Sequence, residues 1–294
     1  MPQCGDSCLG VRPGQRANLF NELDPMSRLF DAMRHVDVAE SNATPVKRAD
    51  TEPTVPNGCK VLTRIALKPE SHILRTTDRQ NSAREHFKYL EHKLRGLRKM
   101  MPLKRILITS SSPKEGKTVV ATNLATTLAT GTSRVLLVDG DMRARANRNL
   151  FGLGEAPGFA DALEGRREPG EVLAYLEDLN IYYVPSGVSS ISPGDLLQGD
   201  RPAAFLRTAD HFDWVVIDSP PVATFADALS LATHADAVVI VVRAGVTARQ
   251  DLEATVAALQ DSGATIAAVI LNACDQPGMD NGRYVYYQGP KNER

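Results

Sequence analysis

The sequence has no apolar run long enough to cross a membrane. Its longest apolar stretches, such as Ala237 to Val242, are strand-length and far shorter than the ~20 residues of a transmembrane helix. The N-terminus also lacks the apolar core of a signal peptide. We therefore expect a cytoplasmic protein.

An excess of one charge is also missing, and cysteine is scarce. The 34 Lys and Arg residues nearly balance the 35 Asp and Glu residues, so nothing global favours nucleic acid as a partner. The chain has four cysteines, of which Cys4 and Cys8 lie too near the terminus to staple a core. Their spacing is not that of a zinc knuckle, and reduced thiols are expected.

Residues 1–60 show little sustained periodicity. They are rich in Pro, Gly, Asn, Asp and Thr, which predicts a mostly disordered segment. Asp24-Pro25 is an exception, because an N-cap followed by proline precedes apolar residues on one helical face from Leu29 to Val36. A short helix over 25–36 is expected, which docks on a partner, folds back on its own domain or stays frayed.

Residues 61–103 form a lead-in segment with a basic helix. Between Ser82 and Met100, apolar residues such as Phe87, Leu90 and Leu94 recur every three or four positions, so one face packs and the other is charged. The charged face is expected to be solvated or to meet an acidic partner or a lipid surface.

Residues 104–275 alternate between apolar runs and helical stretches. The expected strands are Arg105–Thr109, Val135–Val138, Ile181–Val184, Trp214–Ile217, Ala237–Val242 and Ala267–Leu271. The expected helices are Lys117–Ala129, Ala203–His211, Ala226–His234 and Ala248–Ser262. This order predicts an α/β fold of the P-loop NTPase type, a mostly parallel sheet with helices on both faces. Residues 276–294 lose the pattern and are expected to form a flexible tail.

A phosphate-binding loop follows the first strand. The residues expected to bind the nucleotide are Ser112, Pro113, Lys114, Glu115, Gly116, Lys117, Thr118 and Val119. Gly116 permits close backbone approach, so that successive N–H groups and the helix dipole hold a phosphate. Lys117 adds positive charge, and the Thr118 hydroxyl can ligate Mg²⁺. Ser111 replaces the usual first glycine, so the loop alone is an imperfect match.

Three carboxylates at strand ends strengthen the motif. Asp139 and Asp141 follow the second strand, and Asp218 ends a later one. Because parallel strands end on the same edge, these carboxylates should converge with Lys117. Phosphoryl transfer needs one carboxylate near Mg²⁺ and another free to act as a base. Each aspartate alone could be a turn or cap residue, but together with the loop they predict a site for Mg-ATP.

These motifs resemble those of the bacterial tyrosine kinases of capsule and exopolysaccharide synthesis, within the deviant-Walker ATPases. Ser112 to Thr118 resembles the Walker A motif, Val135 to Arg143 the Walker A′ motif and Trp214 to Pro221 the Walker B motif. The resemblance extends from about Glu85 to Ala273.

The resemblance implies an ATP-dependent protein-tyrosine autokinase that regulates polysaccharide synthesis and export, with ATP and Mg²⁺ as cofactors. Catalytic roles are implied for Lys117, Asp139 and Asp141, and metal binding for Thr118, Asp141 and Asp218. Arg143 would be a structural or regulatory residue. Which of Asp139 and Asp141 activates the acceptor hydroxyl stays open.

The family also carries a C-terminal tyrosine cluster that is autophosphorylated between subunits. Here Tyr284, Tyr286 and Tyr287 match it, although a tail that holds three tyrosines by chance is the alternative. The family's transmembrane activator segment is missing from this sequence, which implies either a separate membrane-bound polysaccharide co-polymerase as activating partner or none. With such a partner the expected location is the inner face of the plasma membrane, and the resemblance also allows a homo-oligomer.

Several positions depart from the family or leave alternatives open. The family's assembly motif, a glutamate and two arginines at three-residue intervals, becomes Glu85, Lys88 and Glu91, which argues against a closed ring. The main alternative is a non-kinase ATPase switch of the partitioning or division-site type. Such switches carry a lysine where this chain has Ser112. A nucleotide-binding module with little catalysis is a third reading. Asn272 lies either near the adenine edge or simply at a strand end.

Overall fold

The computed structural model describes residues 60–62, 65, 67, 71–75, 82–144, 150–151 and 155–274. The expected helix at 25–36, the rest of residues 1–59 and the tyrosine-bearing tail therefore lie outside the described residues. All of the described residues fall within one compact unit, Pro53–Arg294.

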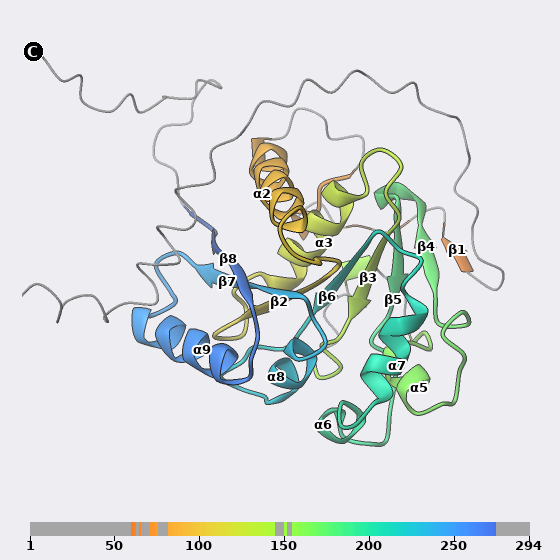
Figure 1. Cartoon of the computed structure of the whole chain (residues 1–294). Coiled ribbons are helices and arrows are strands. Elements are labelled where there is room, and N and C mark those ends of the chain that lie inside the picture. The colour runs from red at the N-terminus through yellow and green to blue at the C-terminus, as the bar shows by residue number, and fades with distance from the viewer. Residues whose placement is uncertain are drawn as a thin grey trace, which may run out of the picture. The chain divides into compact units, whose positions relative to one another are not determined.

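An eight-stranded sheet with the order β1-β4-β5-β3-β6-β2-β7-β8 forms the centre of this unit (Figure 1). Its strands are β1 (Lys60–Leu62), β2 (Arg105–Ser110), β3 (Val135–Asp139), β4 (Ala174–Leu176), β5 (Ile181–Val184), β6 (Trp214–Asp218), β7 (Ala237–Arg243) and β8 (Ile266–Asn272). The six strands from β5 to β8 in this order run parallel, whereas β4 pairs antiparallel with β5. The predicted mostly parallel sheet is confirmed.

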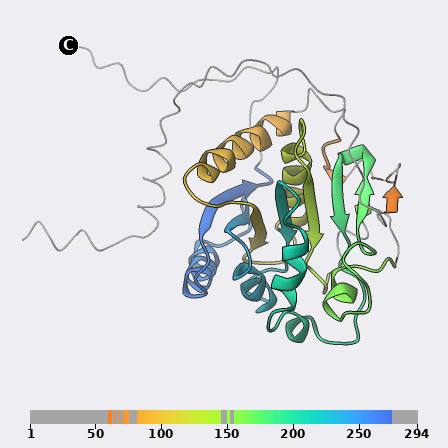
Figure 2. The same cartoon turned by 45° about the vertical axis from the view of Figure 1, so that its right-hand side comes forward.

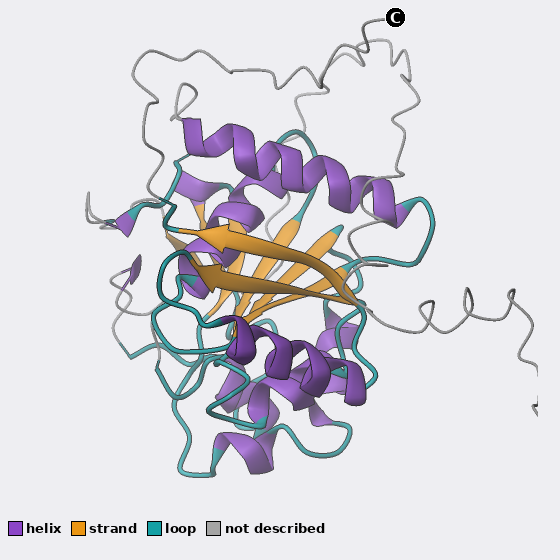
Figure 3. Cartoon of the chain, turned by 90° about the vertical axis from the view of Figure 1, so that its left-hand side faces the viewer, coloured by secondary structure: helices purple, strands orange, loops and turns teal. Residues whose placement is uncertain are grey.

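Helices cover both faces of the sheet (Figures 2 and 3). They are α2 (Ser82–Arg98), α3 (Lys117–Leu128), α5 (Phe159–Leu163), α6 (Pro193–Leu196), α7 (Arg201–Thr208), α8 (Asp227–Ala232) and α9 (Arg249–Asp261). On one face α3 packs against β2, β3 and β6, and α2 packs against α3; on the other, α8 contacts β2 and α9 contacts β8. No helix in the described part of the chain combines the length and apolar character needed to span a bilayer.

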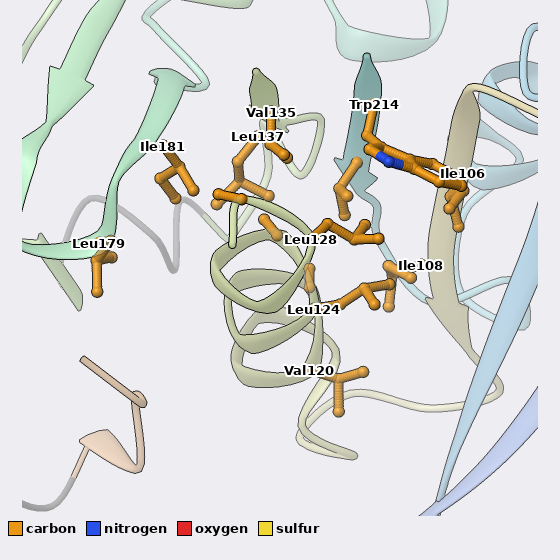
Figure 4. Packing of buried hydrophobic residues seen from close by; sticks show 14 of the residues in the cluster. Ile106, Ile108, Val120, Leu124, Leu128, Val135, Leu137, Leu179, Ile181 and Trp214 are labelled. Carbon is orange, nitrogen blue, oxygen red and sulfur yellow. The ribbon is translucent and has the colours of Figure 1, made fainter. Parts of the chain in front are cut away.

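The helix α3 is buried on almost every side. Ten of its twelve residues are buried, because the sheet covers one flank and α2 the other. Val120, Leu124 and Leu128, spaced four apart, point toward Ile106 and Ile108 of β2 and other strand residues (Figure 4). Burial of each such side chain contributes about 1.5–3 kcal/mol, so this packing fixes the helix that begins at the phosphate loop.

Several charged side chains of the basic helix α2 make contacts within the helix or with the sheet. Glu85 pairs with Lys88 at 2.7 Å, and Glu91 pairs with Arg95 at 2.8 Å. The guanidinium of Arg98 lies 4.6 Å from the ring centroid of the buried Trp214, the first residue of β6. The three residues at the family's assembly positions are thus all engaged in ion pairs within α2.

Two leucine-to-alanine substitutions test this packing. Leu124 is fully buried in α3, whereas Leu271 of β8 is 61% exposed. We expect Leu124→Ala to lower the free energy of unfolding by about 2–5 kcal/mol, because a cavity remains in the core. Leu271→Ala should change it by about 0.5 kcal/mol or less. Urea unfolding measures both, and equal losses would contradict the assigned position of α3.

Candidate nucleotide site

The phosphate loop lies between β2 and α3, and Gly116 forms its tightest point. Gly116 is the N-cap of α3 and has a φ of 95°, in the left-handed region that favours glycine. A Cβ at this position would lie 2.1 Å from Nδ2 of Asn272. A side chain at position 116 is therefore disfavoured both by the positive φ and by the close contact with Asn272, the last residue of β8.

A buried carboxylate within the loop holds its shape. Glu115 is 1% exposed, and its Oε2 accepts a hydrogen bond of 3.2 Å from the backbone N–H of Ser112. Its other oxygen, Oε1, accepts a hydrogen bond from the hydroxyl of Thr247, in the segment between β7 and α9. The two hydrogen bonds of Glu115 thus stabilise the conformation of the loop, a role that its place in the motif did not indicate.

Two further hydrogen bonds join the loop to β7 and β8. The Asn272 Nδ2 donates to the carbonyl oxygen of Glu115 at 2.9 Å, and the Arg243 Nη1 donates to that of Lys114 at 3.1 Å. The Asn272 amide nitrogen, which we considered for the adenine edge, is therefore bonded to the loop backbone. The phosphate loop is anchored on its β7–β8 side.

The carboxylates gather on the other side of the loop. Asp139 and Asp218 stand opposite each other in the register of β3 and β6, and both are fully buried. The Thr118 hydroxyl, in the first turn of α3, donates a 2.7 Å hydrogen bond to Oδ2 of Asp218. Lys117 is 7% exposed at the start of the same helix. The structure thus brings Asp139, Asp218 and the first turn of α3 together at the carboxyl edge of the sheet.

Asp139 and Asp141 also shape the turn that follows β3. Oδ1 of Asp139 accepts the N–H of Asp141 at 3.2 Å, and Oδ1 of Asp141 accepts the N–H groups of Arg143 and Ala144 at 3.2 and 2.9 Å. The turn role that each aspartate could have by itself is therefore real. It coexists with a position at the site, because Asp139 is also the register partner of Asp218 at the end of β6.

Tyr183 of β5 is a neighbour of the site that sequence reasoning missed. It is fully buried, and its hydroxyl lies 3.5 Å from Oδ2 of Asp139, to which it can donate a long hydrogen bond. Burial, followed by the charges of Asp139 and Asp218, raises the pKa of Tyr183 well above its usual value, so the hydroxyl stays protonated. Within an apolar strand run, nothing marked this tyrosine as facing a carboxylate.

Asp227 of α8 is a second residue that the sequence did not reveal. It is 3% exposed and receives Arg143 through a two-pronged contact, with Nε at 2.7 Å and Nη2 at 3.3 Å from its two oxygens. The hydrogen bond to Asp227 raises the pKa of Arg143. The guanidinium also lies 4.1 Å from the ring centroid of Phe225. Arg143 is therefore fixed in place beside the turn that carries Asp141.

The donor set of the site suits Mg²⁺ bound together with a phosphate. In the described residues, no three His, Cys, Asp or Glu side chains lie close enough to hold a metal by themselves. Mg²⁺ usually takes one or two carboxylates, a hydroxyl and waters, with the remaining oxygens from substrate phosphates. The Thr118 hydroxyl and the Asp218 carboxylate already lie within hydrogen-bond distance at the phosphate loop. They supply the hydroxyl and the carboxylate that such an ion needs, so the residues present fit Mg²⁺.

Comparison with known proteins identifies the family. The model of the AAA domain family matches residues 104–267, which is more than half of the chain. The chain belongs to this family. A curated relative, the tyrosine-protein kinase Wzc of Salmonella typhimurium, is 30% identical over 184 residues, covering 62% of this chain and 26% of the relative. The chain thus spans about a quarter of the length of the curated relatives it matches.

Solved structures with a related fold also match this chain. The kinase domain of the Escherichia coli tyrosine kinase Etk matches with 26% identity and a TM-score of 0.65, over 72% of this chain and 84% of that one. The septum site-determining protein MinD of Pyrococcus horikoshii, solved with Mg-ADP, matches at 22% identity and a TM-score of 0.50, over 57% of this chain and 70% of that one. The MinD match shows a common fold alone. The resemblance to bacterial tyrosine kinases that the sequence indicated is confirmed.

Two glycine substitutions test the packing of the loop. Gly116 and Gly131 both have positive φ, 95° and 83°, but only Gly116 has an atom within 4 Å of an added Cβ. Gly131→Ala should cost about 1–2 kcal/mol of unfolding free energy from backbone strain. Gly116→Ala should cost about 1 kcal/mol more, because it also displaces the Asn272 amide from Glu115.

The cause of that difference can be checked with Asn272→Ala in a double-mutant cycle monitored by urea unfolding. Removal of the amide should take away the extra cost of Gly116→Ala, so the two changes should couple. Additive effects, or equal costs for the two glycine variants, would show that the contact with Asn272 is not what restricts position 116.

Proposed function

We propose that this chain is a protein-tyrosine kinase that transfers a phosphoryl group from Mg-ATP to its own C-terminal tyrosines. The observation that carries the proposal is the hydrogen bond of 2.7 Å from Thr118 to Asp218, which lies beside the phosphate loop and next to the strand that ends in Asp139. A loop for phosphates and several carboxylates on one sheet edge are the elements that phosphoryl transfer requires.

The loop residues from Ser112 to Val119 hold the nucleotide in this proposal. Backbone N–H groups around Gly116 and the N-terminus of α3 face the phosphates, and Lys117 offsets their negative charge. Thr118, Asp141 and Asp218 would hold the Mg²⁺, which when bound neutralises charge on the phosphates. The hydrogen bonds of Glu115 keep the loop in this conformation without a ligand. This lowers the entropic cost of ordering the loop when the nucleotide binds.

One of the two carboxylates at the end of β3 and in the turn after it accepts the proton of the acceptor tyrosine. The acceptor tyrosine oxygen forms a bond to the γ-phosphorus as the bond from that phosphorus to the ADP oxygen breaks. The phenolic proton passes to one carboxylate of the Asp139 and Asp141 pair, and the other stays near the metal. The turn hydrogen bonds orient both groups before the substrate arrives.

The acceptors in this proposal are Tyr284, Tyr286 and Tyr287, which lie outside the described residues. A non-kinase ATPase switch is the competing function, since a fold of this kind also occurs in MinD. Such switches use a lysine where this chain has Ser112, and the lysine that this loop does carry, Lys114, stands two positions later. The loop therefore favours the kinase.

The proposed setting of the activity is the regulation of exopolysaccharide or capsule synthesis and export. The support is the relationship to Wzc and Etk. By the same relationship we propose a membrane-bound co-polymerase as the activating partner, which would bring the kinase to the inner face of the plasma membrane, and self-association of the chain.

A lysine substitution tests the kinase. Lys117→Ala should lower phosphotyrosine formation on residues 284–287 at least about a hundredfold, because a charge that stabilises the transferred group is lost. The matched control is Lys99→Ala, which removes an exposed lysine after α2 and should retain the wild-type rate. Mass spectrometry of the purified chain after incubation with Mg-ATP locates and counts the phosphates.

The same measurement separates the two functions. If the wild-type chain hydrolyses ATP and depends on Lys117 for it, yet carries no phosphate on Tyr284, Tyr286 or Tyr287, the ATPase switch replaces the kinase. A chain in which all three tyrosines are changed to phenylalanine should keep its nucleotide affinity and lose the phosphotyrosine signal.

A further inference from the structure

Residues 71–75, which precede α2 in the chain, are attached to the buried helix α3 through Asn123. Oδ1 of Asn123 accepts a hydrogen bond of 2.8 Å from the backbone N–H of Leu74, and Nδ2 donates one of 3.0 Å to the carbonyl oxygen of His72. Asn123 and Leu74 are each 3% exposed. One carboxamide thus pairs with an N–H and a C=O group of the segment, as the backbone of a neighbouring strand would.

Two further contacts hold this docked segment, which is residues 71–75. Arg84 of α2 is buried, and its Nη2 donates a hydrogen bond to the carbonyl oxygen of Arg75. Ile73 is also buried and belongs to the same hydrophobic cluster as Leu124 of α3. If the segment left α3, Ile73 would meet water and both polar ends of the Asn123 carboxamide would lose their partners, so docking is favoured.

The backbone of His72 is held in an uncommon conformation. Its φ is 55°, in the left-handed region that residues other than glycine rarely adopt. Such a conformation persists only when surrounding contacts maintain it, and the carbonyl of His72 is the group that Asn123 binds. The segment therefore has two states. It is docked with His72 held by Asn123, or it is released with His72 relaxed, and release leaves the central strands of the sheet paired.

The helix that binds the segment also carries residues of the phosphate loop. Asn123 follows Lys117 by six residues, which is ~9 Å along the axis at 1.5 Å per residue. Lys117 and Thr118 form the first turn of α3. Energetic coupling between sites travels through rigid secondary elements, so the docking of the segment bears on the position of that turn. A displacement of about 1 Å is enough to spoil the geometry of a site.

We propose that Asn123 is a positioning residue of the nucleotide site, because it couples the docking of residues 71–75 on α3 to the binding of the nucleotide. The inference rests on the nucleotide site of the proposed function. The docked segment holds α3 where Lys117 and Thr118 meet the phosphates, and a bound nucleotide in turn favours docking. Coupling between two binding events is reciprocal, so each strengthens the other by the same factor.

Nucleotide affinity tests the first half of this coupling. The full chain is titrated with Mg-ADP that carries a methylanthraniloyl fluorophore. Asn123→Leu keeps a good helix former of similar size but removes both hydrogen bonds to the segment. We expect its Kd to rise at least about fivefold, within the ~5–150-fold typical of coupled sites.

The matched control is Thr127→Val, one turn further along α3. Thr127 is 1% exposed, and its hydroxyl donates a 2.7 Å hydrogen bond to the Asn123 carbonyl within the helix. This variant removes a buried polar group from α3 and leaves the bonds to the segment in place, so its Kd should stay within about twofold of the wild type. Leu74→Ala changes the segment and leaves α3 untouched. It should raise the Kd at least about threefold, and it carries the test if Asn123→Leu does not fold.

Hydrogen exchange tests the reciprocal half, which a merely structural contact would not show. The exchange rate of the Leu74 N–H is measured by NMR with and without saturating Mg-ADP. In the wild type we expect the nucleotide to slow this exchange at least about fivefold, the same factor that Asn123→Leu costs in affinity. In Asn123→Leu the exchange should be fast and should not respond to the nucleotide.

The outcomes separate this coupling from the kinase function. Equal Kd values for the wild type and Asn123→Leu, a wild-type Kd in Leu74→Ala, or exchange at Leu74 that ignores the nucleotide would overturn the coupling and leave the kinase standing. If the coupling is found but incubation with Mg-ATP yields no phosphotyrosine, the role of Asn123 stands and the proposed kinase function fails. A wild-type chain that does not bind Mg-ADP would overturn both.

Discussion

The hydrogen bond between Thr118 and Asp218 joins the first turn of α3 to the last residue of β6, and the site depends on that junction. It can form only because α3 is clamped between the sheet and α2 while β6 runs beside β2 in parallel. The same alignment brings Asp139, the register partner of Asp218, to the edge. A hydroxyl and two carboxylates thereby meet where the phosphate loop ends.

The site is asymmetric because its two flanks are built from different contacts. On the side of β7 and β8, Arg243 and Asn272 donate hydrogen bonds to the backbone of Lys114 and Glu115, and the Thr247 hydroxyl donates one to the Glu115 carboxylate. On the side of β6 and β3, the carboxylates of Asp218 and Asp139 stand opposite each other in the strand register. The structure therefore separates a flank of contacts to the loop backbone from a flank of carboxylates.

Elements that the sequence predicted well are those with a strong local signal. The strand at Ile181–Val184 was predicted with its observed bounds, and α3 and α9 were predicted to within one residue at each end, because continuous apolar runs and helical periodicity mark them. The short β4, its antiparallel direction and α5 were not predicted. A run of three residues such as Ala174–Leu176 carries no period, and its direction depends on the neighbour with which it pairs.

The sequence by itself determined the loop around Lys117 and the three aspartates at strand ends, since a parallel sheet forces all strand ends to one edge. Only the tertiary structure decided that Tyr183 faces Asp139, that Asp227 holds Arg143 and that Asn272 closes over Gly116. These contacts join residues far apart in the chain, and each partner is an ordinary residue in its local pattern. Its role follows from packing, which no local pattern records.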